Sequence, residues 1–331
     1  MRAAPGWVVV VAVSALAAGP AGGPWQTSVG ADHPLVGVIW DVKAGRVIDE
    51  AALVGRLAAG RFVLLGEKHD NPDHHRLQAR LYGAVLAAGR RPALAFEMLD
   101  GDDAPAVERY LACAPADAAG LGAAVGWERR SWPAWPQYQQ IADLAVKAAL
   151  PVVAANLPDH LARAAARQGL PALPPELAAE LGLDQPLPDA LRAAMAKEIA
   201  DSHCGFAPPG MLEPMILVQR ARDAHMAQAA WRGATADGTV LITGFGHART
   251  DRGVPGHLAR MGASHVVAVA FLEVQAGKET AAAYAADLDA GTLPFDFVWF
   301  TPRLDDADPC EKFRARLDTL KAAQPPATPG S

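Results

Sequence analysis

Two short histidine segments contain the residue types of an acid–base or metal site. Glu67 and His69 stand two residues apart in the segment GEKHD, and His247 lies in the segment GFGHAR. Residues i and i+2 of an extended backbone face the same side, so Glu67 and His69 are expected to point together. Glutamate and histidine suit general acid–base catalysis and the binding of a divalent metal ion. Their spacing is not the helical HExxH of zinc proteases.

Other polar residues also stand where an apolar run ends. Ligands bind at the carboxyl ends of the strands in an open α/β sheet, so these residues are expected to converge. A single carboxylate at a strand end is most often a helix cap, but four strands ending this way favour a shared site. The predicted catalytic residues are Glu67, His69, Glu97 and His247; His69, His247 and Glu97 are the predicted metal ligands, and Asp70, Asn156 and Arg249 are the predicted supporting residues. Asp70 is expected to orient the His69 imidazole.

Apolar runs that could position these residues alternate with helical patterns. Residues 61–67, 73–89 and 92–98 have the spacing of a strand–helix–strand unit, which predicts a parallel pair of strands. The other predicted strands are 150–156, 239–246, 265–273 and 295–300, and the other predicted helices are 134–149 and 255–261. The two histidine segments are expected to end neighbouring parallel strands. The predicted fold is α/β, a mostly parallel sheet with flanking helices and a helical insertion at about residues 157–235.

The two ends of the chain differ in composition from this domain, which is predicted to span residues 35–315. Residues 1–20 read as a cleaved signal peptide, because an arginine precedes a short apolar stretch and an Ala-Leu-Ala cleavage pattern. The alternative is a buried strand or helix. Residues 20–34 are expected to form an N-terminal tail, and residues 316–331 a disordered one. A periplasmic or secreted protein is therefore predicted, with no cysteine suited to lipid attachment near the cleavage site.

The composition is that of a globular protein. Of 331 residues, 51% are hydrophobic and 20% are charged, which argues against a disordered chain. The formal charge is −6 and there is no long basic block, so nucleic acid is not an expected partner. The cysteines are Cys113, Cys204 and Cys310. An odd number leaves at least one unpaired, and both one disulfide and three buried thiols are compatible with the sequence.

Two further segments suit a flat, iron-containing ligand. A tryptophan-rich segment contains Trp132, Trp135 and Tyr138, which form either an aromatic wall for a porphyrin or part of the core. His203 and Cys204 end a helical pattern, as iron ligands or as an ordinary helix terminus. The adjacent His74 and His75 point about 100° apart on a helix, so they are interpreted as surface or local contacts.

Blocks spread along the chain resemble the ChaN family of heme-binding uptake proteins, which belongs with the Tiki and TraB proteins. The resemblance is collinear over about residues 35–315. It is carried by residues 64–75, 95–98, 151–158, 202–205, 244–249, 296–302 and 308–311. It implies an α/β fold, an envelope setting, a homodimer, and heme iron held through a tyrosine and a histidine. Tyr138 is the predicted tyrosine, with His203, Trp132 and Trp135 also predicted to contact heme.

Two functions follow from these observations. The first is a heme-binding protein for heme or iron uptake in the cell envelope, with an outer-membrane receptor as a possible partner. The second is a metal-dependent peptidase or esterase, because Tiki relatives are metal-dependent peptidases and erythromycin esterases share a similar site. In this second reading Glu67 or His69 activates water, and His247 binds the metal ion or stabilises the oxyanion.

Overall fold

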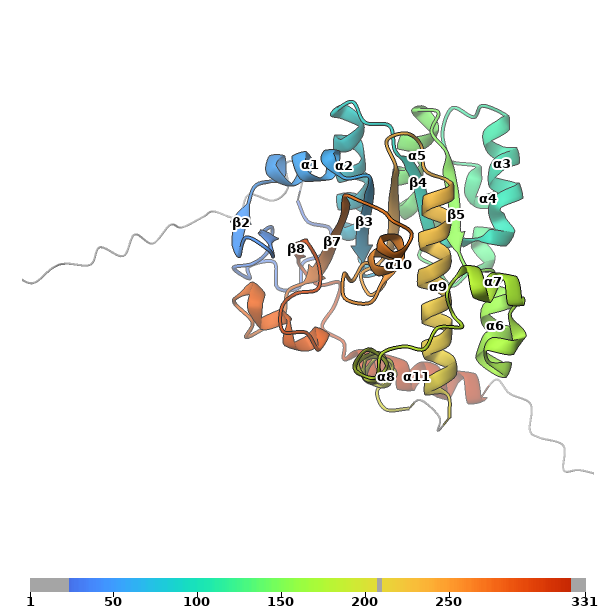
Figure 1. Cartoon of the computed structure of the whole chain (residues 1–331). Coiled ribbons are helices and arrows are strands. Elements are labelled where there is room, and N and C mark those ends of the chain that lie inside the picture. The colour runs from blue at the N-terminus through green and yellow to red at the C-terminus, as the bar shows by residue number, and fades with distance from the viewer. Residues whose placement is uncertain (1–23, 207–209, 323–331) are drawn as a thin grey trace, which may run out of the picture.

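The computed structural model describes residues 24–206 and 210–322, and an eight-stranded sheet forms its centre (Figure 1). The strand order is β2-β1-β8-β7-β3-β6-β4-β5. The strands are β1 (Ile39–Asp41), β2 (Arg46–Ile48), β3 (Phe62–Glu67), β4 (Ala93–Asp100), β5 (Val152–Asn156), β6 (Thr239–Gly244), β7 (Val266–Glu273) and β8 (Phe297–Thr301). The predicted signal peptide, residues 1–20, lies outside the described residues.

Six of these strands run parallel, which confirms the predicted fold class. β3 pairs with β6 and β7, β4 pairs with β5 and β6, and β7 pairs with β8. In the pairing of β3 with β6, Glu67 stands opposite Gly244, so the two histidine segments do follow neighbouring strands. β1 and β2, which the sequence analysis missed, form an antiparallel edge beside β8.

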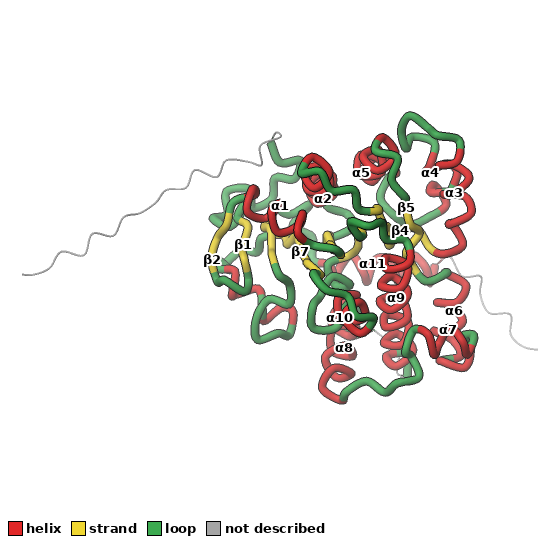
Figure 2. The backbone as a smooth tube through the Cα atoms, turned by 45° about the horizontal axis from the view of Figure 1, so that its top comes forward, coloured by secondary structure: helices red, strands yellow, loops and turns green. Residues whose placement is uncertain are grey.

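Helices cover both faces of the sheet. They are α1 (Glu50–Ala59), α2 (Pro72–Ala87), α3 (Ala104–Ala112), α4 (Leu121–Ala124), α5 (Trp135–Lys147), α6 (Asp159–Gln168), α7 (Pro175–Glu180), α8 (Asp189–Ser202), α9 (Leu212–Arg232), α10 (Val254–Arg260) and α11 (Pro309–Ala322). Figure 2 shows α1, α2 and α5 on one side of the strands, and α9 and α10 on the other. The predicted helical insertion corresponds to α6, α7, α8 and α9.

The alternation of side chains along each strand explains these layers. Val63 and Leu65 of β3 pack into the core beneath α1, α2 and α5, whereas Phe62 and Leu64 pack into the core beneath α9 and α10. Strands that are buried on both faces appear in the sequence as continuous apolar runs. The central strands could therefore be predicted from the sequence as continuous apolar runs, although they show no alternation of apolar and polar residues.

The start of α2 fixes both the loop after β3 and the N-terminal segment. Asn71 caps the helix by accepting from the backbone N–H of Asp73, and Pro72 occupies the first turn. The Asp73 carboxylate accepts hydrogen bonds from the backbone N–H groups of Gln26 and Thr27, at distances between 2.8 and 3.0 Å. The described part of the expected N-terminal tail at residues 20–34 is thus attached to the domain through Gln26 and Thr27.

The C-terminal helix is joined to the helical insertion by a disulfide between Cys204 and Cys310. Cys113 is free and exposed. The predicted disordered tail at 316–331 begins too early, because α11 continues to Ala322. Residues 323–331 lie outside the described part. Within the described ranges, no helix is both long and apolar enough to cross a membrane.

Candidate functional site

The first site residue, Glu67, ends β3 and is fully buried. Its Oε1 accepts hydrogen bonds from the Tyr138 hydroxyl at 2.7 Å and from Nδ1 of His69 at 2.9 Å. Its Oε2 lies 3.2 Å from Nε2 of His75. Burial by itself raises the pKa of Glu67, but the nearby His75 and the hydrogen-bonded His69 outweigh burial and lower this pKa to about 2. Glu67 is therefore an ionised acceptor at neutral pH.

Glu97 on β4 is a second buried carboxylate, and the neighbouring strand β6 holds it in place. Its Oε2 accepts hydrogen bonds from the Thr243 hydroxyl and from the backbone N–H of Gly244, both at 2.7 Å. Its Oε1 faces Nε2 of His247 at 3.4 Å and Nε2 of His69 at 3.9 Å. Burial raises the pKa of Glu97, but the two histidines and the Gly244 N–H lower it further than burial raises it.

His247 lies between two carboxylates after the end of β6. Its Nδ1 donates to Asp223 of α9 at 2.7 Å, while its Nε2 faces Glu97. Burial lowers the pKa of His247, but Glu97 and Asp223 outweigh burial and raise this pKa to about 10. The side chain is therefore an imidazolium at neutral pH, and its two N–H groups point at two acids.

Five side chains thus form one continuous series, which we call the acid–imidazole chain: Asp223, His247, Glu97, His69 and Glu67. The predicted catalytic set is brought together as expected, and Asp223 joins it from the helical insertion. Sequence reasoning missed Asp223 as a site residue. A signal was present, because this aspartate stands among the small residues on the buried side of α9, where an ionisable group requires a partner.

The glycines of both histidine segments permit close contacts. A Cβ on Gly66 would stand 2.8 Å from the Cα of Phe245, which is too close. A Cβ on Gly244 would stand 3.0 Å from Nε2 of His69. Gly244 therefore leaves the space that the imidazole of His69 occupies, and its backbone N–H at the same time binds Glu97.

The three predicted supporting residues have other roles. Asp70 forms an ion pair with Lys68 at 2.6 Å, so the expectation that it orients His69 is wrong, and Glu67 does so instead. Arg249 is fully buried and binds Asp251, away from the acid–imidazole chain. Asn156 accepts from the backbone N–H of Leu157 and lines a cavity beside Glu97.

Tyr138 does not fit the predicted role of iron ligand. Its side chain is fully buried behind Glu67, and its hydroxyl donates to that carboxylate. The other three tyrosines also have bonded hydroxyls: Tyr82 with Pro92, Tyr110 with Asp117 and Tyr284 with Gln275. The predicted heme tyrosine is therefore corrected to a residue that supports Glu67.

The remaining predicted heme contacts separate into a core residue, a cavity residue and a helix terminus. Trp135 is buried and donates its indole N–H to the Ala118 carbonyl, so it belongs to the core. Trp132 is half-buried, and its ring centroid lies 4.8 Å from that of His69. His203 ends α8, where its Nδ1 lies 2.7 Å from the Ile199 carbonyl. The structure thus brings Trp132, but not Trp135, to the site.

His74 and His75 are both fully buried, so the expectation of surface contacts is wrong, but their contacts with Lys68 and Glu67 are local, which was the other expectation. The backbone N–H of Lys68 donates to Nδ1 of His74, so this nitrogen is unprotonated and Nε2 donates to the Thr301 hydroxyl. Burial lowers the pKa of His74 to about 3, which keeps this ring neutral. His75 instead supports Glu67. These adjacent residues in the first turn of α2 thus contact the ends of two different strands, Thr301 of β8 and Glu67 of β3.

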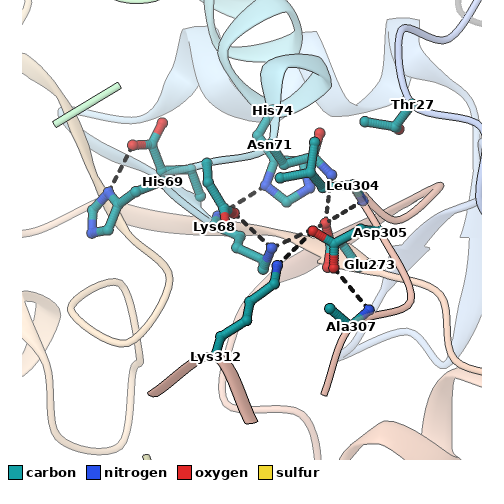
Figure 3. A network of polar contacts seen from close by, with 12 residues as sticks. Thr27, Lys68, His69, Asn71, His74, Glu273, Leu304, Asp305, Ala307 and Lys312 are labelled. Carbon is teal, nitrogen blue, oxygen red and sulfur yellow. Dashed lines mark hydrogen bonds and ion pairs between the residues drawn. The ribbon is translucent and has the colours of Figure 1, made fainter. Parts of the chain in front are cut away.

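A network of polar contacts fixes the loop that carries His69 (Figure 3). Lys68 binds Asp70 and lies 3.4 Å from Glu273. Oε1 of Glu273 also accepts from the Asn71 side chain at 2.8 Å and from the backbone N–H of Leu304 at 2.9 Å. The loop after β3 is thereby attached to the segment that leads into α11, and His69 projects from this fixed loop.

Two cavities meet at the acid–imidazole chain. The first has a volume of about 310 Å³ and lies between His69, His247 and one side of α8, where Met195 and Ile199 line it. The second has a volume of about 580 Å³ and lies on the other side of Glu97, where Trp132 and Asn156 line it. His69 also lines a shallower surface hollow beside Trp132. The His69 side chain remains 34% exposed, so a ligand can reach it.

The expected metal ligands His69, His247 and Glu97 come together, with Glu97 3.4 Å from His247 and 3.9 Å from His69, and each histidine is hydrogen-bonded to a further acid. Among the described residues, no group of three or more His, Cys, Asp or Glu side chains is placed to hold a metal ion. The arrangement instead provides an ionised carboxylate, a fixed imidazolium and one accessible imidazole. It is suited to acid–base work and to binding a ligand through His69.

Comparison with known proteins finds solved structures that are similar to this fold. A solved structure described as "Cofacial heme binding to ChaN of Campylobacter jejuni" matches with a TM-score of 0.59 and 19% sequence identity, covering 79% of this chain and 95% of that one. The type III effector HopBA1 matches at a TM-score of 0.39 and 15% identity, covering 76% of this chain and 91% of that one. A likeness at that second level does not establish a shared fold. No curated protein matches the chain in sequence.

The fold and the site define a mostly parallel α/β protein with a buried glutamate–histidine cluster at the carboxyl edge of its central strands. The family model described as "Haem-binding uptake, Tiki superfamily, ChaN" matches residues 53–258. The chain belongs to this ChaN family. The matched residues include both histidine segments, β4 and the helical insertion, and hence every member of the acid–imidazole chain.

Proposed function

We propose that the protein binds heme and that His69 is the iron ligand. The observation that carries this proposal is the position of His69. Its Nδ1 is bonded to Glu67, which directs the ring, and its Nε2 lies 3.9 Å from Oε1 of Glu97, too far for a hydrogen bond, in a side chain that lines the 310 Å³ cavity. A carboxylate that binds one ring nitrogen fixes the orientation and tautomer of an imidazole whose other nitrogen binds a metal.

The surroundings of His69 fit a flat, apolar ligand. Trp132 stands edge-on to the imidazole, and Met195, Ile199 and Phe245 line the adjoining 310 Å³ cavity. His247 suits iron less well, because its Nε2 lies closer to Glu97, at 3.4 Å against 3.9 Å for His69, and its side chain is 14% exposed against 34%. The four tyrosine hydroxyls are engaged elsewhere, so His69 replaces the tyrosine that the family resemblance implied.

Titration of the purified protein with hemin tests this function. We expect a saturable change in the Soret band for the wild type, and its loss or a shift of the band in His69→Ala. His160→Ala is a matched control, because His160 is an exposed histidine on α6 that pairs with Asp102. The proposal fails if the wild type shows no saturable change, or if His69→Ala and His160→Ala bind hemin equally well.

The cellular role that we propose is heme or iron uptake in the periplasm or outside the cell. Two features support that location: the apolar stretch at residues 7–18, and the Cys204–Cys310 disulfide, since disulfides persist in oxidising compartments. A homodimer and an outer-membrane receptor remain predictions from the family resemblance. Mass measurement by light scattering, with and without hemin, tests the first, and fractionation of cells expressing the full chain tests the location.

A second candidate function is hydrolysis of a peptide or ester. The specific observation in its favour is that His69 is oriented by Glu67, as a general base is, while His247 is held as an acid beside the same cavity. Turnover of a peptide or ester panel that is lost in Glu67→Gln and is sensitive to chelators would support the metal-dependent form. Absence of turnover across the panel, with added divalent metals, would reject it.

A further inference from the structure

The 580 Å³ cavity beside Glu97 contains three arginines that the acid–imidazole chain does not use. The cavity lies at the carboxyl ends of β4 and β5, and its lining includes Glu97, Arg129, Arg130, Trp132, Asn156 and Arg222. Arginine recognises carboxylate and phosphate groups through two parallel N–H donors. The partners of each charged group therefore decide what this cavity can bind.

Two of the arginines have no acidic partner among the described residues. Arg130 is paired with Asp103 and also donates to the Val125 carbonyl. Arg222, by contrast, forms no ion pair in the described part of the chain, and its Nε is buried without a hydrogen-bond partner. Arg129 likewise forms no side-chain hydrogen bond or ion pair there. A buried donor without a partner is destabilising, and a bound anion would remove that cost by accepting its hydrogen bond.

Most of the carboxylates around the cavity already have partners. Asp159 pairs with Arg163, and Glu97 is hydrogen-bonded to Thr243 and Gly244 and faces the two site histidines. Asp100 accepts from the backbone N–H of Asp102, and burial together with the charge of Asp103 raises its pKa. The lining residues without an ion-pair partner in the described part of the chain are thus one carboxylate, Asp100, and two guanidiniums, Arg129 and Arg222, so the uncompensated charge is positive.

The fold gives Arg129 a defined position. It stands at the end of a short 3₁₀ turn, Trp127–Arg129, that follows Gly126. Gly126 has a φ of +65°, a conformation that favours glycine, and a Cβ at this position would collide with the Arg129 guanidinium. The guanidinium thus lies directly over the glycine, at the edge of the cavity. Arg222 comes from α9, one residue before Asp223, which holds His247.

We infer that this cavity binds the carboxylate groups of the ligand through Arg222 and Arg129; for heme these are its two propionates. The inference rests on the proposed function and adds the orientation of the ligand. Trp132 lines both this cavity and the hollow beside His69, so one flat molecule can contact Trp132 and His69 while its acidic edge meets the arginines. The acidic edge of heme would then be directed into the protein.

The test compares hemin with hemin dimethyl ester, in which both propionates are neutral. Each is titrated into the wild type, Arg222→Ala, Arg129→Ala and Arg167→Ala. Arg167 is an exposed arginine of α6 outside the cavity, so its variant controls for loss of one positive charge. Circular dichroism and thermal unfolding of each variant show that it is folded.

We expect the wild type to bind hemin at least about tenfold more tightly than the ester, because a charge-assisted hydrogen bond contributes roughly 1.5–3 kcal/mol. Arg222→Ala should remove most of this preference, because it should weaken the binding of hemin and leave the binding of the ester unchanged. Arg129→Ala should remove part of the preference in the same way. Arg167→Ala should leave it unchanged. Equal binding of hemin and its ester by the wild type, or equal effects of all three variants, would overturn the inference and leave the proposed function intact. Binding of neither compound would overturn both.

Discussion

Oε1 of Glu97 lies 3.4 Å from Nε2 of His247, and Asp223 holds the other nitrogen of the same ring at 2.7 Å. One imidazole is thus placed between two acids that come from β4 and α9. This relationship joins the sheet to the helical insertion, and it keeps His247 protonated. His69, which faces the same carboxylate from the other side, is left as the accessible imidazole of the site.

The first prediction concerns the protonation of His247. Its pKa is raised to about 10 in the folded protein, from 6.5. The stabilisation from this shift is therefore fully present below pH 6.5 and is lost as the pH rises through 10. In NMR spectra we expect the chemical shift of the His247 Cε1–H proton to stay constant between pH 5 and 8. Asp223→Asn should lower the pH at the midpoint of the His247 titration. A midpoint near 6.5 in the wild type would contradict this account.

A second prediction follows from the position of Tyr138. Removing its hydroxyl in Tyr138→Phe deletes a hydrogen bond to a buried carboxylate, so the free energy of unfolding should fall by about 1.5–3 kcal/mol. Tyr110→Phe is the matched control, because the Tyr110 hydroxyl bonds a backbone carbonyl in an exposed turn, and we expect a smaller loss. The Soret maximum of the hemin complex should be the same in both variants. A shift in Tyr138→Phe alone would restore this tyrosine as an iron ligand.

A third prediction tests the space beside Gly244. In Gly244→Ala the new methyl group would stand 3.0 Å from Nε2 of His69, so the imidazole must move. We expect hemin affinity to fall by roughly tenfold, since relieving such crowding typically costs 1–3 kcal/mol. Gly256→Ala in α10 meets nothing within 4 Å and should bind hemin as the wild type does. If Gly244→Ala bound hemin with wild-type affinity, hemin binding would not depend on the present position of His69.

The fourth prediction concerns the disulfide between Cys204 and Cys310. It closes a loop of 106 residues, so its removal should lower the free energy of unfolding by about 2–5 kcal/mol. Thermal or urea unfolding of Cys204→Ser measures this loss, and Cys113→Ser, which changes an exposed free thiol, should show almost none. The free-thiol content of the denatured wild type should be one per chain. Three free thiols, or equal stability of both variants, would disprove the disulfide.

The central part of the fold could be predicted because its strands are buried on both faces. Residues 61–67 and 239–246 stand out as apolar runs that end in polar residues, and their ends lie side by side as expected. The edge strands β1 and β2 were missed because they are three residues long and partly exposed. Such short edge strands have neither an apolar run nor a clear alternation.

The positions of the site residues could be predicted from the sequence, but their hydrogen-bond partners could not. Strand-end residues such as Glu97 and His247 converge by topology, which a sequence pattern reveals. The choice of partner does not follow from the pattern: Asp70 and Glu67 are both near His69 in sequence, and in the structure Glu67 binds His69 whereas Asp70 binds Lys68. Asp223 arrives from a helix 24 residues away along the chain from His247, so its role depends on the packing of α9.

Hemin binding by His69→Ala, measured beside the wild type and His160→Ala, tests the central claim most directly. We expect the wild type and His160→Ala to give the same saturable Soret change, and His69→Ala to lose it or to show a displaced band, because the one accessible imidazole of the acid–imidazole chain is gone. An unchanged band and affinity in folded His69→Ala would contradict the claim that this histidine binds the iron.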